Sequence, residues 1–155
     1  MKTLAIDPGD RCAGYAIFAD KVLTVCGLVR GEKKIDMITD FGNQIGTLTF
    51  DKIVIEKMNP DAVKAQRFNL ARDLIDVAFV GGLLVGRASR NPNTEIVEVI
   101  PSQWKGQVPR EIMDARVVKH LNVFERLAVE KVRPASLAHN ARAAVGIGLW
   151  SVGRL

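Results

Sequence analysis

The chain has 155 residues, of which 48% are hydrophobic and 25% charged, enough apolar material for the core of one soluble domain. No apolar run approaches the roughly 20 residues that a membrane-spanning helix needs, and the early Asp7 argues against a secretory signal. The two cysteines, Cys12 and Cys26, make no disulfide framework, so we expect free thiols in a reducing, cytoplasmic compartment. The net charge of +5 favours a polyanionic partner.

The first thirty residues predict three β-strands joined by short turns. Residues 2–9 form a strand pattern that runs into a Pro-Gly turn. Residues 13–20 and 21–30 are apolar and rich in β-formers, with a charged break at Asp20 and Lys21. We expect these segments to form a three-stranded antiparallel meander.

The rest of the chain is expected to alternate helices with strands. The pattern predicts a helix over 32–49, a buried strand over 53–56, a long helix over 59–89, a strand that ends at Pro101, a helix over 109–124 and a C-terminal helix with one packed apolar face over 137–150. This order favours a single α/β domain over residues 1–155, with a mixed sheet and helices packed on it.

Two predicted strands end in acidic residues. Asp7 ends the first strand and Glu56 ends the fourth. If the two strands are neighbours, both carboxylates emerge at the same edge of the sheet. Mg²⁺ and Mn²⁺ prefer oxygen ligands, and a paired-metal site of this kind can promote hydrolysis of a phosphodiester. Alone this is a weak signal, because acids at strand ends are more often solvated turn residues.

Four motifs extend this signal over nearly the whole chain. They are "IDPGDRCAGYAI", "IVIEKM", "VIPSQWKG" and "HNARAAVGIGLW". In this order they resemble the RuvC-type Holliday junction resolvases of the RNase H-like superfamily. The resemblance implies an RNase H-like mixed five-stranded sheet, a two-metal nuclease site for Mg²⁺ or Mn²⁺, four-way DNA junctions as substrate, and a homodimer that makes two symmetric nicks. The short spacings suggest a phage or prophage member.

The resemblance assigns roles to residues at both ends of the chain. Asp7 would be the central metal ligand and Glu56 the second acid. The family's last acid precedes a small-apolar run, and aligning that run with "AAVGIGL" puts Ala143 where an Asp is expected. Asn140, one helical turn earlier, falls where the family has an acid or a histidine, and His139 is the alternative ligand in another register.

The alanine at position 143 has two interpretations. Either an Asp→Ala change was engineered there to stop cleavage, or the chain is a natural relative that binds branched DNA without cutting it. In both cases we expect it to bind one metal poorly and to cleave slowly or not at all. A third hypothesis is a YqgF-type RNA-processing nuclease, which shares the opening motif.

Basic and aromatic residues suggest where DNA would bind. The resemblance implies that the segment after Glu56 faces the junction centre and that Phe68 stacks on an unpaired base; the alternative is a core residue. Candidate DNA contacts are Lys57, Lys64, Arg67, Phe68, Lys105 and Arg110. Residues 76–86, with two adjacent glycines, are the candidate dimer interface, or else a buried core helix of a monomer.

Overall fold

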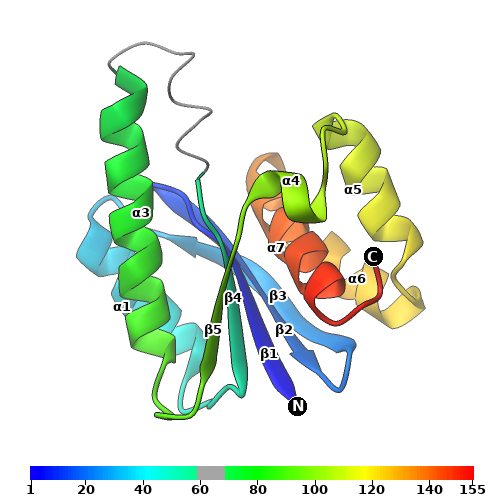
Figure 1. Ribbon diagram of the computed structural model, residues 1–155, viewed down its shortest axis with the longest axis horizontal. Helices are drawn as coiled ribbons and strands as arrows, with labels where there is room; N and C mark the ends of the chain where they lie inside the picture. The colour runs from blue at the N-terminus through cyan, green and yellow to red at the C-terminus, as the bar shows by residue number, and fades with distance from the viewer. Residues whose placement is uncertain (59–68) are drawn as a thin grey trace.

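A mixed five-stranded sheet forms the centre of the molecule (Figure 1). The computed structural model describes residues 1–58 and 69–155. The strands are β1 (Lys2–Asp7), β2 (Cys12–Ala19), β3 (Val22–Arg30), β4 (Lys52–Glu56) and β5 (Glu95–Val99). β1, β2 and β3 form an antiparallel meander, β4 runs parallel to β1, and β5 runs parallel to β4. The order β3-β2-β1-β4-β5 confirms the expected α/β fold class.

The hairpin between β2 and β3 lies at the predicted charged break. Asp20 and Lys21 have φ angles of 47° and 73°, and Ala19 pairs directly with Val22. Positive φ at both central residues is what a two-residue hairpin turn needs to match the twist of its strands. Cys12 and Cys26 are free thiols, as expected.

Helices cover both faces of the sheet. α1 (Lys34–Ile45) and α3 (Asn69–Ala88) lie on one face, and α7 (Ala138–Ser151) lies on the other (Figure 1). Outside α7 are three further helices and a 3₁₀ turn: α4 (Pro101–Trp104), α5 (Arg110–Lys119), α6 (Val123–Glu130) and η1 (Ala135–Leu137). None of the helices in the described residues is long and apolar enough to span a bilayer.

The single helix expected over 109–124 is wrong, because the chain turns between α5 and α6. Asn122 caps α6: its side chain accepts the Glu125 amide at 3.0 Å, while the Glu125 carboxylate accepts the Asn122 amide at 2.8 Å. This reciprocal capping box starts a new helix where the periodic pattern had continued one. The long helix expected from residue 59 is observed from Asn69 onward, and its predicted start lies outside the described residues.

The C-terminal helix is buried nearly all round, where a single packed face was expected. Every residue from Ala144 to Leu149 is buried, as is Ala141. Their side chains join sheet residues such as Ala16 to outer residues such as Met113 in one core cluster. A helix that is apolar on every side fits only between two layers, so the centre of α7 is held firmly against the sheet.

Candidate active site

The alternation of side chains along β1 and β4 sends both predicted acids toward α7. In β1, Ile6 packs on the α1 and α3 side, while Ala5 belongs to the cluster around α7. In β4, Val54 likewise faces α7. Since side chains alternate with a period of two, Asp7 and Glu56 point to the same face as Ala5 and Val54. The parallel pairing of β1 with β4 brings them to the same end of the sheet.

A glycine on β2 brings the first turn of α7 over these strand ends. Gly14 pairs with Asp7 across the β1–β2 ladder. A Cβ on Gly14 would lie 2.0 Å from the carbonyl oxygen of Asn140, a distance that no side chain can occupy. The backbone of α7 therefore rests directly on β2 beside Asp7. Because Gly14 has no side chain, the first turn of α7 can contact β2 directly.

One cavity of about 390 Å³ collects most of the predicted site residues. Those that line it are Asp7, Glu56, Lys105, Arg110, His139, Asn140 and Ala143. They come from β1, β4, the end of α4, α5 and the first turns of α7. The structure thus brings together carboxylates, an amide, an imidazole and two cationic side chains, which is a donor and charge set suited to a metal ion and a phosphate.

The acidic pair is only partly neutralised. Burial, followed by the negative charge of Glu56, raises the pKa of Asp7 to about 8, while Lys105 and Arg110 act in the opposite direction. The Glu56 side chain is 10% exposed, and its Oε2 lies 4.0 Å from the Lys105 ammonium. Two close carboxylates with incomplete compensation favour uptake of a proton or a cation.

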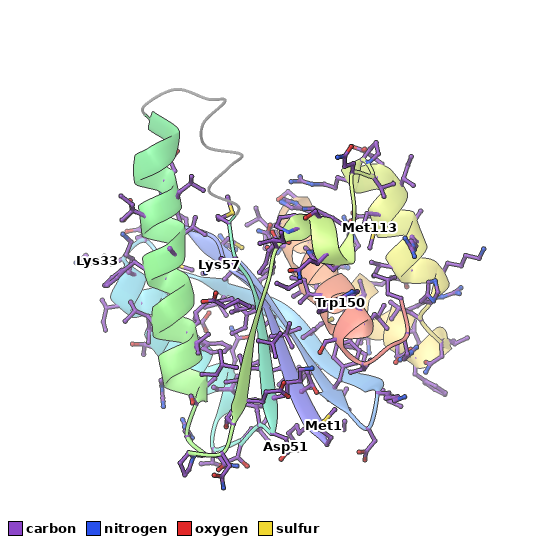
Figure 2. All side chains as sticks on the ribbon, viewed as in Figure 1. Met1, Lys33, Asp51, Lys57, Met113 and Trp150 are labelled. Carbon is purple, nitrogen blue, oxygen red and sulfur yellow. The ribbon has the colours of Figure 1, made fainter. Side chains whose placement is uncertain are left out.

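Some predicted residues lie elsewhere. Lys57, the residue after β4, forms an ion pair with Glu98 at 2.6 Å and does not line the acidic cavity; Figure 2 labels it beside α3. The predicted DNA contacts Lys64, Arg67 and Phe68 lie outside the described residues. His139 lines the cavity, but its Nδ1 is 3.2 Å from the carbonyl oxygen of Ser136.

Three residues that line the cavity and make polar contacts there, Trp104, Asp114 and Arg142, were not predicted as site residues. Trp104 donates its indole N–H to Oε2 of Glu56 at 2.5 Å. Asp114, from α5, pairs with Arg142 of α7 at 2.7 Å. The "PSQWK" motif pointed to the first of these, but a tryptophan after a strand is more often simply packed. No pattern pointed to Asp114, because its partner is 28 residues away.

The donor set accommodates a hard cation but is incomplete for two. Within residues 1–58 and 69–155, no cluster of three or more His, Cys, Asp or Glu side chains is placed to hold a metal ion. Asp7, Glu56 and the Asn140 amide remain as oxygen donors around the cavity. Burial and the charge of Glu56 raise the pKa of Asp7 more than Lys105 and Arg110 lower it, so negative charge at this place is only partly neutralised. Ala143 lines the same cavity, and its side chain supplies no oxygen donor.

The comparisons with known proteins identify the fold. No protein-family model and no curated protein matches the sequence. In structure, the chain is similar to RuvC of Thermus thermophilus, with a TM-score of 0.60 and 15% identity over 99% of this chain and 98% of that one. The same RuvC in complex with a Holliday junction substrate gives 0.62 and 16% over 99% and 96%. The fowlpox virus resolvase in complex with substrate Holliday junction DNA gives 0.64 and 16% over 99% and 97%.

The chain therefore has the RNase H-like fold of the RuvC-type and poxvirus Holliday junction resolvases. The similarity extends over nearly the full length of both chains, so it includes α7 as well as the sheet. The expectation drawn from the four motifs is confirmed for the fold.

Proposed function

We propose that this chain is a structure-selective endonuclease for four-way DNA junctions whose nicking activity is disabled at Ala143. The observation that carries the proposal is the shared cavity. Asp7 and Glu56 open into it from two parallel strand ends, and Asn140 and Ala143 face it from the first turns of α7. Two solved proteins of this fold were captured with junction DNA.

The cationic residues of the cavity would hold the DNA backbone. Lys105 and Arg110 line the side of the cavity formed by α4 and α5. A phosphate entering beside the two carboxylates would be attracted by these cations and held away from the acids. Contacts to the backbone orient a protein on DNA without reading base sequence, which suits recognition of a branched shape.

Mg²⁺ or Mn²⁺ would be held by Asp7 and Glu56, with the amide oxygen of Asn140 or the imidazole of His139 beside them. When bound, such a cation supplies electrostatic stabilisation of the phosphodiester and lowers the pKa of a water. A third carboxylate at position 143 would complete the oxygen donors for a second cation. The residues present support binding of DNA better than they support its cleavage.

A natural junction-binding protein without nuclease activity is the second candidate. It is favoured by the absence of a third acid suitably placed in the described part of the cavity. Asp114 lines the cavity but is held by Arg142. Both candidate functions involve binding of the same branched DNA. They differ in the expected effect of an acid at position 143, which would restore nicking only in the disabled endonuclease.

The test is a nicking assay on a labelled four-way junction with Mg²⁺ or Mn²⁺. We expect Ala143→Asp to cut the junction at symmetric positions, about 100-fold or more faster than the chain itself, because one acid completes the metal site. The matched control is Ala143→Asn, which has the same shape without the charge. Junction binding without nicks from any variant would support the non-cleaving protein. Absence of binding, or preference for structured RNA, would contradict the junction-resolving function.

The proposed endonuclease would act as a homodimer through α3. Ile75, Phe79 and Leu83 are exposed and spaced by four residues, so they form one apolar stripe. A two-fold axis would use this stripe twice and place two cavities on one junction. We expect Phe79→Ser to convert a dimer to a monomer in sedimentation equilibrium, while Ile112→Ser on exposed α5 leaves the mass unchanged. An identical monomer mass for all three proteins would contradict the dimer.

A further inference from the structure

Trp104 is held in one orientation by its packing. It ends α4, the short helix that follows β5, and its side chain is 5% exposed. The ring packs over Gly146 of α7, where a Cβ would lie 2.5 Å from the ring atom Cζ3. Only glycine at position 146 leaves room for the indole at this distance. The indole is therefore fixed between α7 and the end of β4.

Among the described residues, the packed ring donates one hydrogen bond, to the second acid of the cavity. The indole N–H donates to Oε2 of Glu56 at 2.5 Å. An indole N–H is a donor only, so this bond cannot reverse its direction. A hydrogen bond to a carboxylate is also stronger than one between neutral groups. A carboxylate has about four lone-pair sites, so Glu56 keeps acceptor capacity for a cation.

The next residue covers the same ring from outside. The Lys105 ammonium lies 5.3 Å from the centre of the Trp104 ring and 4.0 Å from Oε2 of Glu56. A cation over an indole face is attracted by the ring. The N–H edge of the Trp104 indole thus contacts Glu56, and the face of the ring contacts the Lys105 ammonium. One side chain therefore sets the positions of two charged groups.

We propose that Trp104 is a positioning residue that orients the Glu56 carboxylate for a divalent cation. The inference rests on the proposed metal-dependent function and deepens it, because it concerns how the second acid is presented. Partners that orient metal ligands typically contribute 10- to 100-fold in metal affinity. A tryptophan that served packing alone would contribute to folding stability but not to the affinity of the folded protein for the cation.

The test measures Mn²⁺ binding from the loss of the free-ion electron paramagnetic resonance signal. The measurement is made in the Ala143→Asp background and in the chain itself. We expect Trp104→Phe to weaken Mn²⁺ binding about 10- to 100-fold. The matched control is Trp150→Phe, since Trp150, labelled on α7 in Figure 2, does not line the cavity. Replacing Trp104 with 3-benzothienylalanine, a near-isostere without the N–H, covers the case in which the phenylalanine variant does not fold.

A spectroscopic signal provides a second readout. In Trp150→Phe, Trp104 is the only indole in the chain. We expect Mg²⁺ to change its fluorescence emission and Glu56→Gln to abolish that change. If Glu56→Gln weakens Mn²⁺ binding while both Trp104 replacements leave it unchanged, the positioning role is overturned and the proposed metal site stands. If Glu56→Gln also has no effect on binding, the proposed metal site itself is overturned.

Discussion

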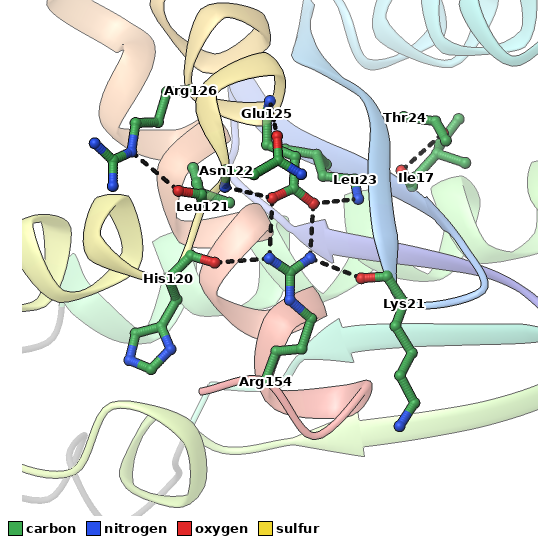
Figure 3. A network of polar contacts seen from close by, with 10 residues as sticks. All are labelled: Ile17, Lys21, Leu23, Thr24, His120, Leu121, Asn122, Glu125, Arg126 and Arg154. Carbon is green, nitrogen blue, oxygen red and sulfur yellow. Dashed lines mark hydrogen bonds and ion pairs between the residues drawn. The ribbon is translucent and has the colours of Figure 1, made fainter.

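Two shielded carboxylates, Glu125 and Asp7, sit in opposite electrostatic environments. Glu125 is on α6, its side chain is 1% exposed, and Arg154 meets both of its oxygens at 2.6 and 2.9 Å (Figure 3). Its oxygens also accept the backbone amides of Leu23 and Asn122 at 2.8 Å each. The hydrogen bond from Arg154 is the main reason that the pKa of Glu125 falls to about 2.

Within the described residues, no arginine is paired with Asp7 in this way. Burial, followed by the negative charge of Glu56, raises the pKa of Asp7 to about 8, against the opposing influence of Lys105 and Arg110. Arg154 also donates to the carbonyl oxygens of Lys21 and His120, so the pair joins the β2–β3 turn, α5 and α6 (Figure 3). In the folded protein, Arg154 neutralises the negative charge of Glu125, whereas the negative charge of Asp7 is only partly neutralised. A carboxyl group in a cavity with a strongly raised pKa is a candidate functional group.

The largest expected effect comes from breaking the completed pair. Arg154→Met leaves Glu125 buried without its cation, so we expect the free energy of unfolding at pH 7 to fall by about 3–5 kcal/mol. Urea denaturation measures this loss. The matched control is Arg116→Met on the exposed side of α5, which should change stability by less than about 1 kcal/mol.

The stability lost in Arg154→Met should depend on pH in a definite direction. The pKa of Glu125 in the folded protein lies below its usual value of 4.5, so its stabilisation is present above pH 4.5 and is lost as the pH falls toward 2. The gap in stability between the parent and Arg154→Met should therefore narrow over this range. A gap that stays constant down to pH 2.5 would contradict the assigned role of the pair.

A smaller change of opposite sign is expected at the cavity. Asp7→Asn removes the uncompensated charge, so we expect the unfolding free energy at pH 8 to rise by about 2 kcal/mol in EDTA. The folded pKa of Asp7 lies above its usual value of 3.8, so between pH 3.8 and 8 the unfolded chain loses this proton while the folded protein keeps it. The folded protein therefore loses stability as the pH rises through this range. Thermal unfolding at several pH values measures the difference.

The control for this variant is Asp73→Asn, which changes an exposed acid on α3. It should leave the pH profile of stability unchanged. If Asp7→Asn instead lowers the free energy of unfolding at pH 8, the Asp7 carboxyl stabilises the fold as that of Glu125 does, and the proposed difference between the two acids is wrong.

The sequence was most informative where a local pattern sets the structure. The strand patterns and their terminal acids pointed to Asp7 and Glu56, a weak signal until four motifs showed the resemblance to the RuvC-type resolvases. The apolar period predicted the helix that carries Asn140 and Ala143, and the resemblance alone made those two residues candidates. The pattern of a strand or helix therefore gave the elements, and the resemblance gave the roles.

The missed features depend on contacts between distant segments. Glu125 looks like an ordinary surface charge on a helix until Arg154, 29 residues away, closes over it. Trp104 becomes part of the site only because β4 and β5 are neighbours and Gly146 leaves room for its ring. The break between α5 and α6 depends on Asn122, whose capping role a continuous apolar period conceals.

The direct contact of α7 with Gly14 has an evolutionary consequence. Because main-chain atoms set the distance between helix and sheet, the frame of the cavity does not depend on which small side chain occupies position 143. Some alanine codons differ from an aspartate codon by a single base. Under the proposed function, one such change would convert a protein that holds its DNA into one that cuts it, or the reverse, without a change in the scaffold.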